Sequence, residues 1–140
     1  MNRYMQFDIR KFIIESPSWD KEIREKEREL ENVSELKAGG DSQGRSSVKS
    51  DPVASVVQVR TKIQWEIARL NTYKQAYEEA FSLLDQEQQE VIKLFFFTDG
   101  YKGAQIELFG YDHNISVRGV YRLKRIALQI MSDYITDEYM

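Results

Sequence analysis

The sequence predicts an all-α protein in which N-terminal helices and a long helix form a coiled-coil-like hairpin, followed by a C-terminal helix-turn-helix. Two prolines and seven glycines in 140 residues leave few helix breakers. Apolar residues recur at three- and four-residue spacing in several blocks, which is the period of helices that bury one face. A hydrophobic content of 41% is enough for a core. We therefore expect a small helical domain with an extended helical appendage.

The first 36 residues are predicted to form N-terminal helices. Residues 1–15 carry closely spaced apolar side chains and favour a short helix, with a strand as the alternative. The Ser-Pro-Ser sequence at 16–18 then starts a second helix, because proline is favoured in a first helical turn. This second helix, up to residue 36, has few apolar residues among many Glu, Lys and Arg. It fits a coiled-coil or partner-binding helix, and equally a solvated helix with one narrow packed stripe.

Residues 37–52 are predicted to be a flexible linker, because glycine and serine dominate them. A phosphate-binding loop is not expected there, since no Walker-type Gly-Lys-Ser/Thr sequence follows. The Ser-Asp-Pro sequence at 50–52 is a strong helix start. One long amphipathic helix is therefore expected over 53–84.

Apolar residues repeat every seven positions along that long helix, which favours a helical hairpin or a coiled coil. The repeat consists of Val56, Ile63, Leu70, Tyr77 and Leu84. Its partner is either the 17–36 helix, folded back antiparallel, or the same helix of a second subunit in a homodimer. Four aromatic residues could instead form a stacking surface, but aromatic residues at helical spacing are more often core. They are Trp65, Tyr73, Tyr77 and Phe81.

Residues 85–133 are predicted to form the helix-turn-helix. Thr98-Asp99-Gly100 ends a first helix, and a scaffold helix follows over 103–113, with Ile106 and Phe109 on one face. Two crossing helices need a small residue at their closest approach, and Gly110 supplies it. Asn114 tolerates the left-handed backbone of a sharp turn. Ile115 can then fill the corner, and the next helix, with Val120 and Leu123 toward its core, begins after Ser116, a good N-cap residue.

The last helix of this motif carries an outward basic stripe. Four basic residues and no acidic one lie between 116 and 126. The first turns of such a helix, placed in a major groove, bring these side chains near base edges and phosphates. The expected contacts are to base edges from Arg118 and Arg122, to thymine methyls from Val117 and Tyr121, and to phosphates from Ser116, Lys124 and Arg125. The alternative is an amphipathic helix whose basic face is only solvated.

These residues resemble a known group of proteins. The segment ISVRGVYRLKRIAL resembles the recognition helix of sigma-70 region 4-like domains, and most closely that of the small phage and prophage regulators of the ArpU and RinA type. LDQEQQEVIKLFFF resembles the helix before that motif, and GRSSVKSDPVASVV resembles an upstream segment of the same proteins. The resemblance covers 39–131, with His113 in place of a usual leucine and Gly119 in place of a common Ser or Thr. It implies a transcriptional regulator of late, packaging or lysis genes that binds specific double-stranded DNA.

Two other functions fit the same pattern. A small-terminase-like packaging protein would join a helix-turn-helix to an oligomerising coil. A protein-interaction module would use the C-terminal helices to bind RNA polymerase without touching DNA. RNA polymerase is therefore a candidate partner besides DNA and a second copy of the chain.

The composition argues against several other classes of protein. The sequence has no cysteine and a single histidine, His113, which we expect to be a buried or capping residue. It lacks a nucleophile elbow, a cluster of metal ligands and a glycine-phosphate motif, so we expect no enzyme, no cofactor and no metal site. It has no run of about 18 apolar residues, and its first residues are too charged for a signal peptide. We therefore expect a cytoplasmic protein without a membrane partner.

Charge is unevenly distributed along the chain, although its net value is only −3. Residues 101–131 carry five Lys or Arg and two acidic residues, whereas the last nine residues carry three acidic residues and no basic one. We interpret 134–140 as an acidic tail that follows the helix-turn-helix. A basic element on an acidic body is compatible with DNA binding through one face.

Overall fold

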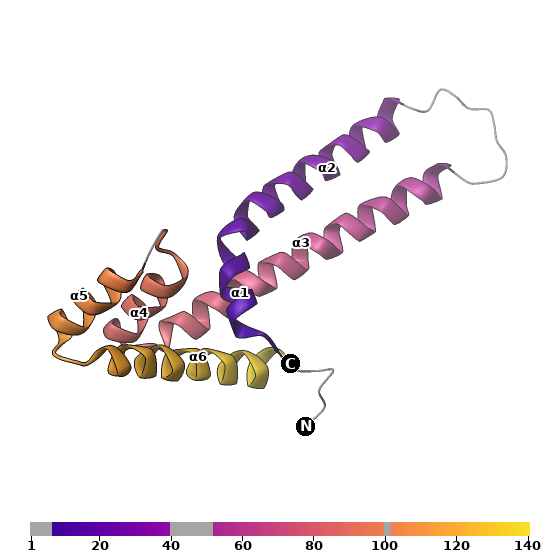
Figure 1. The fold of residues 1–140 in the computed structure, drawn as a ribbon. Helices are drawn as coiled ribbons and strands as arrows, with labels where there is room; N and C mark the ends of the chain where they lie inside the picture. Colours follow the sequence, from indigo (N-terminus) through magenta and orange to yellow (C-terminus); the bar gives the residue numbers. More distant parts are fainter. Residues whose placement is uncertain (1–6, 40–51, 100–101) are drawn as a thin grey trace. The chain divides into compact units, whose positions relative to one another are not determined.

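The computed structural model describes residues 7–39, 52–99 and 102–140, and within them it contains helices and no strand. This confirms the all-α fold class and excludes a strand over 9–15. The elements are α1 (Ile9–Glu15), a 3-10 turn η2 (Ser16–Ser18), α2 (Trp19–Gly39), α3 (Pro52–Ser82), α4 (Gln86–Phe96), α5 (Gly103–His113) and α6 (Val117–Tyr139) (Figure 1). None of these helices is both long enough and apolar enough to cross a membrane.

The predicted linker lies mostly outside the described residues. Of the range 37–52, the structure describes α2 as far as Gly39 and α3 from Pro52 onward. The long helix agrees with the expected 53–84 to within two residues at either end. Pro17 lies in the short 3-10 turn, and α2 begins after it at Trp19.

The chain divides into two compact units, and the division differs from the domains expected from the sequence. One unit comprises Met1–Pro17 and Gln75–Met140, and the other comprises Ser18–Lys74. Helix α1, which we had grouped with α2, packs against α6 in the first unit. The reason is Ile13, which is fully buried in the core of that unit.

Within the Ser18–Lys74 unit, α2 and α3 lie side by side and antiparallel (Figure 1). The Lys74 ammonium is 2.5 Å from the Asp20 carboxylate, and the Lys26 ammonium is 2.5 Å from the Glu66 carboxylate. Residues later in α2 thus pair with residues earlier in α3, as an antiparallel arrangement requires. Hydrogen bonding to Lys74 lowers the pKa of Asp20. Of the two partners considered for the long helix, the structure has the 17–36 helix of the same chain.

The middle of the heptad stripe of α3 is buried in this unit, but Trp65, one of the aromatic residues expected in a core, is not. Ile63 and Leu70 are buried in this unit, opposite Trp19 and Ile23 of α2. Trp65 is 75% exposed, so the expectation that it belongs to the core is wrong. Two residues of an α-helix turn through about 200°, which places Trp65 on the opposite side of α3 from Ile63.

Helix α6 contributes more buried residues to the core of the other unit than any other helix, and α1, α4, α5 and the end of α3 supply most of the rest. Its buried residues are Ile13, Ala76, Ala80, Leu84, Val91, Ile92, Ile106, Val120, Ala127, Leu128, Met131 and Ile135. Tyr77 and Phe81, two of the four aromatic residues expected in a core, pack against this cluster. Helix α6 contacts α4, α5 and α1 and therefore holds this unit together.

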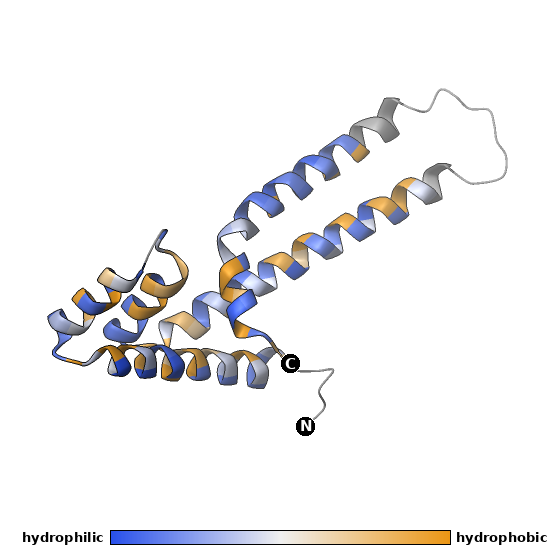
Figure 2. Ribbon diagram, viewed as in Figure 1, coloured by the Kyte–Doolittle hydropathy of each residue, from blue (hydrophilic) through white to orange (hydrophobic). Residues whose placement is uncertain are grey.

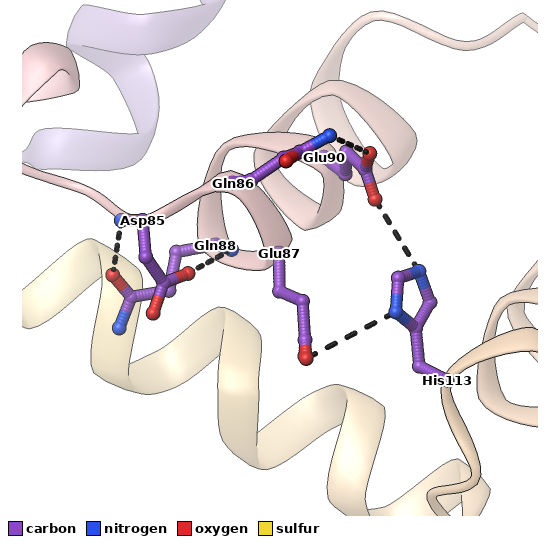
Figure 3. Close-up of polar contacts among 6 residues, drawn as sticks. All are labelled: Asp85, Gln86, Glu87, Gln88, Glu90 and His113. Carbon is purple, nitrogen blue, oxygen red and sulfur yellow. Dashed lines mark hydrogen bonds and ion pairs between the residues drawn. The ribbon is translucent and has the colours of Figure 1, made fainter.

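Helix α4 begins with a reciprocal capping box (Figure 3). The Asp85 carboxylate accepts a hydrogen bond from the Gln88 backbone N–H at 2.8 Å, and the Gln88 side chain accepts one from the Asp85 N–H at 3.0 Å. Two backbone donors that a helix start leaves unpaired are thereby satisfied. This cap sets where α4 begins.

The segment 134–140 is not a separate tail, which corrects our interpretation of it. Helix α6 continues through Tyr139, and Ile135 is 1% exposed. The hydroxyls of Tyr134 and Tyr139 donate hydrogen bonds to the same Glu79 oxygen, at 2.7 and 2.6 Å. These bonds raise the pKa of both phenols to about 12 and lower the pKa of Glu79. The apolar spacing of α6 simply continues beyond Met131, and the acidic residues occupy its outer side.

Candidate functional site

A sharp turn joins α5 to α6, and its backbone is left-handed at one residue. Asn114 has φ 59° and ψ 41°, and no other non-glycine residue among those described has a positive φ. The next N–H, that of Ile115, donates to the Gly110 carbonyl at 2.8 Å. Asparagine is one of the few residues that tolerate this conformation. The prediction of a left-handed Asn114 is therefore confirmed.

Helices α5 and α6 approach closely at Gly110. A Cβ added there would lie 2.7 Å from the Ile115 carbonyl oxygen and 3.4 Å from a methyl of Val120. The first of these atoms belongs to the backbone, so it cannot move aside by a change of rotamer. The prediction that Gly110 is the small residue at the crossing is confirmed, and the crossing sets the direction in which α6 leaves the turn.

The start of α6 is capped by Ser116. Its hydroxyl accepts a hydrogen bond from the Gly119 N–H at 3.0 Å, and its extended backbone begins the helix as an N-cap should. A Cβ at Gly119 would lie 3.3 Å from the Ile115 Cβ and 3.4 Å from the Ser116 hydroxyl. The first turn of α6 is thus closely packed against the turn that precedes it.

The outward face of α6 presents three arginines on one stripe. Arg118, Arg122 and Arg125 are exposed and follow one another at spacings of four and three residues, so they lie on the same face of the helix. Within the described part of the chain, no carboxylate forms an ion pair with any of them. Val117 and Tyr121 are 43% and 47% exposed beside them. The three arginines, Val117 and Tyr121 are thus all exposed, as the sequence predicted.

Lys124 occupies a different side of α6 from the arginines. Its ammonium lies 4.5 Å from the centre of the Phe95 ring and 5.6 Å from that of Tyr121. The rings of Phe95 and Tyr121 are themselves 5.3 Å apart. Burial, with a smaller effect from the nearby Arg10, lowers the pKa of Lys124. The structure therefore groups the three arginines and places Lys124 against α4, a separation that the count of basic residues did not reveal.

His113 connects the end of α5 to the start of α4 (Figure 3). Its Nε2 lies 3.3 Å from a Glu90 carboxylate oxygen, and its Nδ1 lies 3.9 Å from one of Glu87. Its ring also packs on Phe109, with 4.2 Å between centroids. The side chain is half-buried rather than fully buried and bridges two helices. Glu87 and Glu90 are three residues apart on one helix face, which is the signal that could have identified them as a pair.

The outer side of α5 carries apolar residues that the sequence interpretation missed. Leu108 is 59% exposed and Tyr111 is 82% exposed, and their spacing of three residues puts them on one face. Ile106 of the same helix is buried, as expected, and Phe109 is half-buried. The periodicity that identified α5 as a helix gave no reason to expect large apolar side chains on both of its sides.

No group of three or more His, Cys, Asp or Glu side chains in the described ranges is arranged to hold a metal ion. Comparison of the chain with protein-family models, with curated proteins and with solved structures gave no significant match. The resemblance to regulators of the ArpU and RinA type therefore stays a prediction.

Proposed function

We propose that the protein is a sequence-specific DNA-binding transcriptional regulator of the phage or prophage type. In this proposal α5, the turn and α6 form a helix-turn-helix of the sigma-70 region 4-like kind, and the first turns of α6 enter the major groove. The observation that carries the proposal is the exposed stripe of Arg118, Arg122 and Arg125, which has no carboxylate partner in the described structure.

Arginine suits this role because its planar guanidinium can bind the O6 and N7 atoms of guanine with two hydrogen bonds. Arg118 and Arg122 are the candidates for such contacts, and Arg125 is the candidate for a phosphate contact. The basic part of the stripe is limited to the first half of α6. Further along the same side, Gln129 donates a hydrogen bond to Asp133 at 2.8 Å, and an acidic residue there would repel phosphates. The expected DNA footprint is therefore that of the N-terminal turns of α6.

The support for a regulatory role, as opposed to DNA binding alone, is the resemblance in sequence. It covers the helix before the motif, the motif itself and an upstream segment, and it implies control of late, packaging or lysis genes. A DNA-binding protein that assembled into rings would instead support the small-terminase-like alternative.

The test is binding to DNA from around the protein's own gene, measured over a series of salt concentrations with unrelated competitor DNA. The variant Arg118→Ala/Arg122→Ala removes two exposed arginines four residues apart. Arg24→Ala/Arg28→Ala is a matched control, because it removes two exposed arginines at the same spacing from α2. Each two-bonded arginine–guanine contact contributes about 1–3 kcal/mol to discrimination. We expect the first variant to bind the specific site at least roughly thirtyfold more weakly and the control to bind normally.

Equal binding by the two double variants would contradict the major-groove assignment. The dependence of binding on salt gives a second readout, because the slope of log K against log salt falls by about one for each phosphate that the protein no longer neutralises. Arg125→Ala should reduce this slope on specific and unrelated DNA alike.

A second candidate function is a protein-interaction module that binds RNA polymerase without DNA. The exposed Leu108 and Tyr111 on α5 favour it, because large exposed apolar side chains often mark protein contacts. In that case Leu108→Ala/Tyr111→Ala would abolish binding to the polymerase, and Arg118→Ala/Arg122→Ala would leave binding intact.

A further inference from the structure

The outward side of α3 within the Ser18–Lys74 unit is nearly free of charge. Of the twelve exposed residues between Ser55 and Thr72, only Lys62 and Arg69 are charged, whereas nine of the ten exposed residues between Trp19 and Asn32 of α2 are charged. Figure 2, which colours buried and exposed residues alike, shows α2 almost wholly hydrophilic and α3 with hydrophobic bands along its length. The outer side of α2 is therefore highly charged, whereas the outer side of α3 is made of uncharged polar and apolar residues with two basic ones.

Five of these exposed residues form a continuous line, which we call the outer seam of α3. They are Gln58, Thr61, Trp65, Ala68 and Thr72. Their spacings of three, four, three and four residues are those at which one helix presents a stripe to a second helix. The seam lies opposite the stripe of Ile63 and Leu70 that is buried inside the unit.

At one end of the outer seam, a polar side chain can be covered without being left unpaired. The Thr72 hydroxyl already donates to the Ala68 carbonyl at 3.0 Å. Trp65 is 75% exposed, a state that is unusual for so large an apolar side chain. Tryptophan is among the residues most enriched where protein interfaces are fully buried.

We propose that the outer seam is the contact between two copies of this chain, with α3 of one copy packed on α3 of the other. A symmetric interface requires one surface to supply both the protruding and the receiving parts. The seam does so, because Trp65 is flanked by the small residues Thr61 and Ala68 at four and three residues' distance. The five residues of the seam are uncharged and can face their own copies without repulsion between like charges, while Lys62 and Arg69 lie along one edge of the seam.

This dimer differs from the one considered from the sequence. That dimer used the heptad stripe, but Ile63 and Leu70 are buried in the unit formed with α2, and Tyr77 and Leu84 belong to the core of the other unit. The dimer through the outer seam also does not depend on DNA binding, so either proposal can fail without the other.

The first experiment uses Trp65 as a reporter. The protein has two tryptophans, and Trp19 is 3% exposed in the α2–α3 core, so Trp19→Phe leaves Trp65 as the only one. We expect the emission of Trp65 to shift to shorter wavelength as the protein concentration rises. The mass measured by sedimentation equilibrium should double over the same range. If the measured mass is that of one chain, and the emission of Trp65 is that of a solvent-exposed tryptophan, at every concentration, the dimer is refuted. The seam would then be a contact surface for a helix of a different protein.

The second experiment locates the interface. Ala68→Glu places a carboxylate on the seam of each copy, and Ala104→Glu makes the same change at an exposed alanine of α5. We expect Ala68→Glu to raise the dimer dissociation constant by about tenfold or more, because two like charges would be buried close together. Circular dichroism should show the same helix content in both variants. If both variants dimerise equally well, the interface lies elsewhere and the proposal is wrong.

Discussion

The substitution Gly110→Ala tests whether close contact between α5 and α6 determines the structure of the candidate site. The new Cβ would lie 2.7 Å from the Ile115 carbonyl oxygen. Because Ile115 is part of the turn that carries Asn114, relief of this contact requires the backbone of the turn to move. Overpacking of this kind costs about 1–3 kcal/mol. Replacing glycine by alanine inside a helix opposes this cost with a gain of about 1 kcal/mol. Because a backbone atom moves less easily than a side chain, we expect the free energy of unfolding to fall by about 1–2 kcal/mol.

The assay is urea unfolding followed by far-ultraviolet circular dichroism, with tryptophan fluorescence recorded in parallel. Both tryptophans, Trp19 and Trp65, lie in the Ser18–Lys74 unit, so fluorescence shows whether that unit is unaffected. Ala104→Gly, at an exposed position of α5, measures the intrinsic effect of glycine in the same helix. If Gly110→Ala stabilised the protein by as much as Ala104→Gly destabilises it, the two helices would not approach closely at Gly110.

Two further substitutions test local features of the structure. Asn114→Ala should lower the free energy of unfolding by about 1 kcal/mol, because a left-handed backbone is unfavourable for alanine. Asn114→Gly should not lower it, because glycine adopts this conformation freely. Equal urea midpoints for the two variants would contradict this prediction. In an ultraviolet titration, Tyr134 and Tyr139 should ionise near their raised pKa of about 12, and Glu79→Gln should bring both pKa values back toward the ordinary one. Because the folded pKa exceeds the unfolded value of 10, these hydrogen bonds stabilise the fold fully below pH 10, and the stabilisation is lost as the pH rises toward 12.

The ends of the helices around the candidate site could be predicted from the amino-acid sequence alone. The sequence placed the scaffold helix at 103–113, the left-handed residue at Asn114 and the cap at Ser116, and the structure has all three. It also placed Arg118, Arg122 and Arg125 on an exposed side of α6, although it grouped Lys124 with them. These features depend on residues no more than about four positions apart, through helix periodicity, capping and backbone conformation, so they can be read along the chain.

Which helices pack together, and which faces stay exposed, became evident only from the folded chain. The fold joins α1 to α6, places Lys124 over Phe95 and brings Tyr134 and Tyr139 to Glu79, more than fifty residues earlier in the chain. It also leaves Trp65 in solvent. Periodicity shows that a helix has a face to bury but does not show what will cover it, because that depends on contacts between segments distant in sequence. For the same reason the sequence alone suggested an acidic tail after Met131. In the structure, the burial of Ile135 and the hydrogen bonds of the Tyr134 and Tyr139 hydroxyls stabilise this segment as part of α6.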